Sequence, residues 1–170
     1  FTHVLAGTQK GISMRELVVR ISSPTVPNLI VTDCPGLVQI ACTDQGQPAD
    51  IKDQIRTLIK QQIADDNTVI IAVMPARDDL EADPCLEVVA ECDPTFQRTL
   101  GVLTKPDLVQ PGSNCLQNYL TNQNISQDLQ VGHGYFSIKL GGNPLYTHAE
   151  RLADEKTFFS NLPDYKTFQH

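Results

Sequence analysis

The sequence lacks the features that mark membrane, secreted and metal-binding proteins. No apolar run approaches the roughly 18 residues that a membrane-spanning helix needs, and the chain begins at Phe1 without a charged leader or an apolar signal segment. Its five cysteines are an odd set, with no Cys-x-x-Cys pair and no histidine at metal-ligand spacing. These absences favour free thiols in a reducing compartment and predict a cytoplasmic protein.

Positive charge is also scarce. Lys and Arg number 13 against 20 Asp and Glu, which gives a net charge of −7. This balance argues against nonspecific binding to nucleic acid or to an anionic bilayer, although a local group of backbone amides could still bind one small anion. The 170 residues are 41% hydrophobic and 19% charged, which is typical of one folded globular domain.

Apolar runs and helical stripes alternate along the chain. The apolar runs predict strands at 14–22, 29–32, 68–74, 99–103 and 135–140. Apolar residues at helical spacing predict helices at 49–65 and 80–92, and two further helices are expected at 113–122 and 147–161. We expect the first two strands to pair as an antiparallel hairpin around the proline-containing turn at 24–28. The remaining order predicts an α/β fold, a mostly parallel sheet with helices on both faces.

Ligands of such sheets bind at the carboxyl ends of the strands, and one distinctive group follows the run at 29–32. Asp33-Cys34-Pro35-Gly36 stands directly after it. A carboxylate there could hold a divalent cation through water. Gly36 would let its backbone N–H approach a phosphate oxygen without a side chain in the way. The alternative is an ordinary Pro-Gly turn.

A second group follows the run at 99–103. It is Thr104-Lys105-Pro106-Asp107. Asp107 could accept two parallel N–H bonds from the Watson–Crick edge of guanine, whereas adenine would oppose the carboxylate with a lone pair. The Lys105 stem could lie over the purine while its ammonium stays hydrated. The alternative here is a loop in which Asp107 caps a helix.

The two groups together resemble the third (DxPG) and fourth (TKxD) nucleotide-binding motifs of Ras-like GTPases. The stretches GQPADIKDQIRTLIKQQI, AECDPTFQRTLGVLTKPDL and EKTFFSNLPDYK resemble the dynamin superfamily, and within it the interferon-induced Mx group most closely. The similarity runs from about Gly11 to Tyr165. We therefore expect residues 1–170 to be part of a dynamin-type GTP-binding domain, from after the first switch to near the domain end.

The resemblance implies GTP and Mg²⁺ as cofactors and assigns roles to individual residues. Asp33 would reach Mg²⁺ through water and the Gly36 amide would bind the γ-phosphate or the attacking water, so these two are the implied catalytic residues. Residues 37–48 would form the second switch loop. The implied nucleotide-binding residues are Asp33, Cys34, Pro35, Gly36 and Leu37, then Thr104, Lys105, Pro106 and Asp107, then Lys139, Leu140, Gly141 and Gly142 of a fifth motif over the base and ribose.

Two residues depart from the family pattern. Cys34 replaces the usual Leu, which is a tolerable exchange for a small apolar side chain, whereas Gly141 stands where Mx proteins usually carry Arg and makes the fifth motif a weak match. The resemblance also implies self-association through the GTP-binding domain and, in the full-length protein, through a stalk. It further implies membrane or microtubule association and antiviral action. These associations and the antiviral action follow only from the resemblance, and no individual residue of the sequence indicates them.

The sequence contains no GxxxxGK[ST] phosphate-binding loop. Without that loop, no amides cradle the β-phosphate and no Lys contacts the γ-phosphate. We therefore expect a partial chain that lacks the central P-loop strand of the sheet, with exposed apolar strand edges and marginal stability. The alternative function is a nonenzymatic interaction module that binds no nucleotide.

Overall fold

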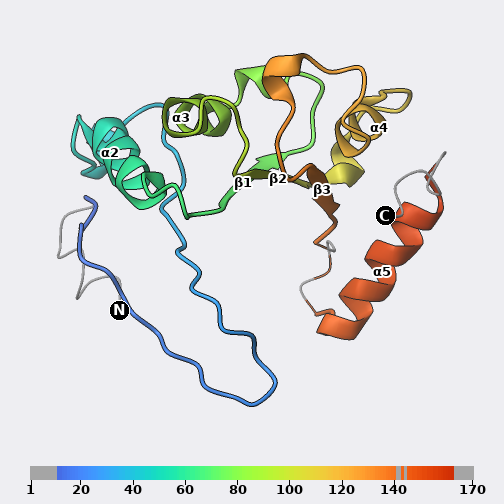
Figure 1. Cartoon of the computed structure of the whole chain (residues 1–170), viewed down its shortest axis with the longest axis horizontal. Helices are drawn as coiled ribbons and strands as arrows, with labels where there is room; N and C mark the ends of the chain where they lie inside the picture. The colour runs from blue at the N-terminus through green and yellow to red at the C-terminus, as the bar shows by residue number, and fades with distance from the viewer. Residues whose placement is uncertain (1–10, 141–142, 144, 163–170) are drawn as a thin grey trace. The chain divides into compact units, whose positions relative to one another are not determined.

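The computed structural model describes residues 11–140, 143 and 145–162. Contacts divide the chain into two units, Phe1–Ala64 and Asp65–His170. Gly141 and Gly142 of the predicted fifth motif lie outside the described residues. The elements of both units are labelled in Figure 1.

The regular structure of the first unit lies near its end. A 3₁₀ turn, η1 (Thr43–Gln45), precedes helix α2 (Ile51–Ile63). Isoleucines recur on one stripe of α2, and Ile51 and Ile55 are each only 2% exposed. Burial of such a stripe is what stabilises a short amphipathic helix. The helix predicted at 49–65 is therefore confirmed with slightly shorter bounds.

The two strands predicted before α2, at 14–22 and 29–32, are wrong, and the hairpin between them is wrong with them. Residues 11–42 contain no strand, although the turn predicted between the two is present. The apolar side chains stay in solvent, with Val18 80% and Ile30 94% exposed. A strand needs a partner for its N–H and C=O groups, and alternating hydrophobicity does not supply one.

The second unit is built on a parallel sheet of three strands (Figure 1), β1 (Ile70–Pro75), β2 (Thr99–Thr104) and β3 (Tyr135–Ile138) in the order β1-β2-β3. Gly101 pairs with Tyr135 in the register. A Cβ on Gly101 would lie 2.2 Å from the Tyr135 ring, so the glycine makes room for that ring. The α/β class and the parallel sheet are confirmed.

Helices follow the strands as the sequence predicts. The longer ones are α3 (Pro84–Cys92), α4 (Cys115–Leu120) and α5 (His148–Ser160), and the 3₁₀ turns are η2 (Leu80–Ala82), η3 (Pro106–Leu108) and η4 (Gln127–Leu129). Pro84 explains why the segment 80–92 divides into η2 and α3, since Pro suits the first turn of a helix. The Asp83 side chain caps α3 by accepting from the Cys85 N–H.

The core lies on one face of the sheet. Helix α3 contacts β1 and helix α4 contacts β3. The side chains of Ala72, Met74 and Leu103 are at most 1% exposed. Tyr119 of α4 meets Tyr135 edge to face, with ring centroids 5.2 Å apart, a favoured aromatic geometry.

The opposite face of the sheet is open over the residues that the structure describes. Ile71 and Val73 are each 56% exposed and Phe136 is 57% exposed. The register pairs Val73 with Val102, and Val102 with Phe136, so these side chains share one face. Alternating burial is the pattern of a sheet covered on one side. Helices α3 and α4 therefore cover the face that carries Ala72, Met74 and Leu103.

A polar network fixes the start of β2. Asp93 and Thr99 are buried, and the Thr99 hydroxyl donates to Asp93 Oδ2 at 2.7 Å. The Arg98 backbone N–H donates to the same oxygen at 3.1 Å. The Arg98 guanidinium donates to the carbonyls of Thr68 and Cys92. These bonds join the segments before β1 and β2. They therefore stabilise the amino-terminal ends of the strands, whereas the predicted ligand-binding groups follow the carboxyl ends.

Candidate functional site

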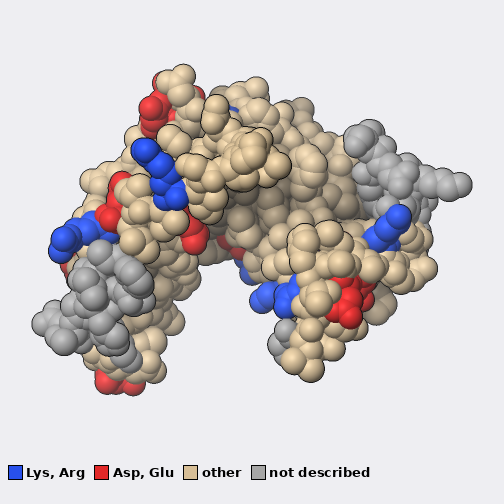
Figure 2. Space-filling model, turned by 90° about the horizontal axis from the view of Figure 1, so that it is seen from below, with Lys and Arg blue, Asp and Glu red and all other residues tan. Residues whose placement is uncertain are grey.

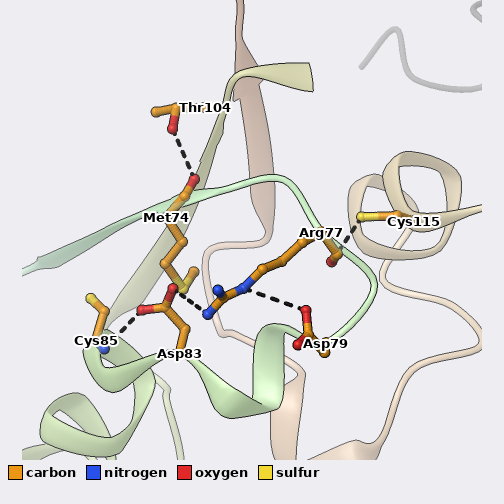
Figure 3. Close-up of polar contacts among 7 residues, drawn as sticks. All are labelled: Met74, Arg77, Asp79, Asp83, Cys85, Thr104 and Cys115. Atoms are coloured by element: carbon orange, nitrogen blue, oxygen red, sulfur yellow. Dashed lines mark hydrogen bonds and ion pairs between the residues drawn. The ribbon is translucent and has the colours of Figure 1, made fainter. Parts of the chain in front are cut away.

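The carboxyl end of β2 is held firmly to β1. The Thr104 hydroxyl donates to the Met74 carbonyl at 3.1 Å (Figure 3). The Ala76 N–H donates to the Thr104 carbonyl at 2.8 Å, which extends the ladder past the end of both strands. The side chain of Thr104 therefore faces the neighbouring strand and positions the loop that follows it.

Lys105 has an unusual backbone conformation. Its φ of 55° and ψ of 44° lie in the left-handed region, which costs a non-glycine residue roughly 1–2 kcal/mol. The following residue, Pro106, is buried, and the Leu108 N–H donates to the Lys105 carbonyl at 3.0 Å. The buried proline and this hydrogen bond hold the backbone of Lys105 in its strained conformation. Backbone strain of this kind is concentrated at functional sites of proteins.

The strained turn directs two polar side chains outward. Lys105 and Asp107 are both exposed. Asp107 lies inside η3, whose N-cap is Lys105, so the alternative role of Asp107 as a helix cap is not what the structure shows. Asp107 also lines a pocket of about 390 Å³. The apolar wall of that pocket includes Pro106 and Leu116, together with Phe158 of α5 and Leu162 just after that helix.

Lys139 follows β3 and is bound by α5. Its ammonium forms an ion pair with Asp154 and lies 5.8 Å from the centre of the Phe158 ring. Its backbone N–H donates to Glu155 Oε1 at 2.8 Å. The hydrogen bond with Asp154 raises the pKa of Lys139, and the charge of Asp107 adds to the shift. Lys139 follows β3 and Asp107 follows β2, and these two strands are neighbours in the sheet.

The Asp33–Leu37 loop belongs to the first unit. Asp33, Pro35 and Gly36 are exposed, and a Cβ on Gly36 would meet nothing within 4 Å. This openness fits a close approach by a ligand. Burial, with the charge of Asp33, raises the pKa of the half-buried Cys34 thiol, which opposes the formation of a reactive thiolate.

The predicted switch loop at 37–48 has a small ordered centre. The backbone N–H of Cys42 donates to Gln47 Oε1 at 2.8 Å, and the Gln47 N–H donates to the Cys42 carbonyl at 3.2 Å. These reciprocal bonds close the loop around η1. Lys52 of α2 donates to Gln39 Oε1 at 3.1 Å, so the loop is also attached to the helix that follows it.

The described residues contain no group of three or more His, Cys, Asp or Glu that could hold a metal ion. Asp33 is a single exposed carboxylate. Mg²⁺ is commonly held by one or two carboxylates together with phosphate oxygens of a substrate. Asp33 therefore fits a Mg²⁺ ion that arrives with a nucleotide, and a metal cage made by the protein alone does not fit.

Arg77, just after β1, was not predicted as a site residue. Figure 3 shows its guanidinium between two carboxylates, 2.9 Å from Asp83 Oδ2 and 3.6 Å from Asp79 Oδ1. The Arg77 carbonyl accepts from Cys115 Sγ at 3.0 Å. Arg77 thus joins the end of β1 to the start of α3 and to α4. No sequence spacing marks these contacts, because they depend on three separate elements.

Charged residues of both signs are mixed on one face of the molecule. On the face drawn in Figure 2, Lys and Arg lie in small separate groups, interspersed with Asp and Glu. Among the residues described, no helix has the length and apolar character needed to cross a membrane.

Comparisons with known proteins point to one family. The sequence model of the dynamin family matches residues 2–106. The chain is 35% identical over 168 residues to the interferon-induced GTP-binding protein Mx of Ctenopharyngodon idella, covering 96% of the chain and 26% of that protein. It is 37% identical over 174 residues to dynamin-1 of Homo sapiens, covering 97% of the chain and 19% of that protein. The chain thus spans about a quarter or less of the length of these relatives.

Proposed function

The chain belongs to the dynamin family, and from that premise we propose that it forms part of the GTP-binding and GTP-hydrolysing domain of a dynamin-like large GTPase. The observation that carries the proposal is the strained turn at the end of β2. There Lys105 is held in the left-handed region while the carboxylate of Asp107 lines a pocket.

Asp107 accounts for base selection. Its two carboxylate oxygens accept the N1–H and the exocyclic N–H of guanine. Adenine would place a lone pair against the same carboxylate and leave it unpaired, which is a strong source of discrimination. The stem of Lys105 covers one face of the purine. Lys139 and Leu140, which follow β3, lie beside the base and ribose.

The first loop would act on the phosphates. Asp33 would hold Mg²⁺ through water, and the Gly36 N–H would contact the γ-phosphate or the attacking water. The metal ion, when bound, would neutralise charge on the phosphates and help to position the water, so that hydrolysis would need no covalent intermediate. Residues 37–48 are the switch loop that responds to the γ-phosphate. The bonds between Cys42 and Gln47 would be part of its resting conformation.

For the whole protein, we propose a cytoplasmic GTPase that self-associates through this domain and a stalk. Membrane or microtubule association and antiviral action are proposals of the same kind. Relatives of both the Mx and the dynamin type match at 35% and 37% identity, so assignment to the Mx branch remains a prediction.

Titration of a fluorescent GTP analogue in the presence of Mg²⁺ tests the proposal, with the folded state of the sample checked by far-UV circular dichroism. We expect saturable binding that unlabelled GTP reverses and that ATP at the same concentration does not. Equal displacement by ATP would overturn the base-reading role of Asp107.

One set of observations favours the alternative, a nonenzymatic interaction module. The sequence has no GxxxxGK[ST] loop, and Ile71, Val73 and Phe136 expose an apolar sheet face. Exposed apolar surfaces of this kind often mark sites of protein contact. Failure of a folded sample to bind the GTP analogue at any concentration would favour this second function.

A further inference from the structure

Helix α5 contacts the site through polar groups more than through a core. None of its residues is buried. Its N-terminus is fixed independently of the sheet by a capping box, in which Thr147 and Glu150 bond reciprocally. The middle of the helix is bound to the segment that follows β3 by two bonds to Lys139.

Two consecutive residues of α5 bind different parts of Lys139. Asp154 pairs with the ammonium, and Glu155 accepts the backbone N–H at 2.8 Å. Neighbouring residues of a helix point about 100° apart, so these two carboxylates hold Lys139 from two directions. This arrangement fixes both its backbone and its side chain. The Lys139 side chain is only 13% exposed as a result.

Phe158 connects the same contact to the candidate base site. It stands four residues after Asp154, on the same face of the helix. Its ring lies 5.8 Å from the Lys139 ammonium, within the range of a cation–π interaction. Phe158 also lines the pocket that contains Asp107. The helix thus contacts the loops after both β2 and β3.

We propose that Asp154, Glu155 and Phe158 form a clamp that fixes Lys139 beside Asp107 and thereby sets the affinity for guanine nucleotides without touching the nucleotide. This inference rests on the proposed function. Its physical basis is preorganisation. If only a fraction of the molecules have the binding-competent conformation, the apparent affinity for the ligand is reduced in proportion to that fraction. The three clamp residues are positioning residues, and the groups that contact the base lie in the two loops.

The first experiment needs no nucleotide. Lysines are acylated briefly under limiting reagent, and the rate at each site is measured by mass spectrometry. We expect Lys139 to react more slowly than the exposed Lys105, because a paired and protonated amine is a poor nucleophile. Asp154→Asn should raise the Lys139 rate several-fold, and Asp154→Glu should restore it. Equal Lys139 rates in the wild type and in Asp154→Asn would overturn the clamp.

The second experiment measures the dissociation constant of the fluorescent GTP analogue. Asp154→Asn should weaken binding about three- to fivefold, the range expected from loss of a partly exposed ion pair, and Asp154→Glu should recover it. Asp66→Asn is the matched control, because Asp66 is exposed, lies in the same unit and loses the same charge. It should leave both the Lys139 rate and the affinity unchanged.

The outcomes separate the two proposals. If the wild type binds the analogue and Asp154→Asn binds it equally well, the clamp is overturned while the proposed function stands. If the wild type binds no analogue although acylation shows Lys139 protected, the proposed function fails, and the link from the clamp to affinity fails with it. Weaker binding in Asp154→Asn that Asp154→Glu does not restore would indicate general disruption and would also overturn the clamp.

Discussion

Replacing Lys105 by Gly and by Ala separates the conformation of this residue from its side chain. Both variants remove the ammonium and the stem, but only Gly is free of the left-handed penalty. That penalty is roughly 1–2 kcal/mol for Ala. Gly loses more conformational freedom on folding, by roughly 0.5–1 kcal/mol. The difference leaves the Gly variant more stable than the Ala variant by about 0.5–1 kcal/mol.

Urea denaturation followed by circular dichroism measures this difference directly. In a thermal scan, 1 kcal/mol corresponds to about 2–4 °C in Tm for a chain of this length, so the Gly variant should melt about 2 °C higher than the Ala variant. At a position with negative φ the order would be reversed. An Ala variant that is the more stable of the two would therefore refute the left-handed conformation of Lys105 (φ 55°).

The same pair of variants tests why the strain persists. If the Lys105 side chain covers the purine, the Gly and Ala variants should lose affinity for the GTP analogue equally, despite their different stabilities. A Gly variant that binds as tightly as the wild type would show that the Lys105 side chain does not contribute to the site.

Three further predictions concern the fold. Thr99→Val should lower the free energy of unfolding by about 1–3 kcal/mol in urea denaturation, because it leaves the buried Asp93 carboxylate without the 2.7 Å bond from Thr99; an unchanged midpoint would contradict this. Burial, reinforced by a nearby carboxylate, raises the pKa of Cys85 and of Cys115 from 9.0 to about 11. The folded chain then keeps protons that the unfolded chain releases, so stability is complete below about pH 9 and falls between about pH 9 and 11. Replacing both cysteines by Ala should flatten that slope. Val73→Lys, on the open sheet face, should reduce light scattering by aggregates while changing the free energy of unfolding by less than about 0.5 kcal/mol.

The sequence predicts the second unit well. The three strands of the sheet carry strong local signals in their apolar runs, and the helix predicted at 147–161 is present as α5 (His148–Ser160). The parallel order follows because consecutive strands are joined by helices, which is the usual connection in a parallel sheet.

The first unit shows where local pattern fails. Residues 14–22 and 29–32 have the hydrophobicity of strands, but the described chain gives them no partner, and side chains such as Ile30 remain exposed. In β1, likewise, the apolar run predicts burial, but Ile71 and Val73 on one face remain exposed. An apolar run indicates that a segment is suited to burial, and it does not say whether another element covers it.

Parts of the candidate site could not be predicted for a related reason. The motif TKPD identifies Lys105, but nothing in a Lys-Pro pair predicts a left-handed backbone, and proline restricts the residue before it. The bonds from Asp154 and Glu155 to Lys139 join residues that are 15 and 16 positions apart. The carboxylates have no distinguishing spacing within α5, so only the folded arrangement shows what they bind.

The most direct test of guanine recognition by Asp107 is a change of base preference. Asn in place of Asp107 offers one acceptor and one donor, which matches the N1–H and the C2 carbonyl of xanthine and opposes the exocyclic N–H of guanine. The dissociation constants of GTP and XTP are therefore measured for the wild type and for Asp107→Asn. We predict that the wild type prefers GTP and that the variant prefers XTP. A variant that loses both nucleotides equally, or that keeps the preference for GTP, would contradict this assignment.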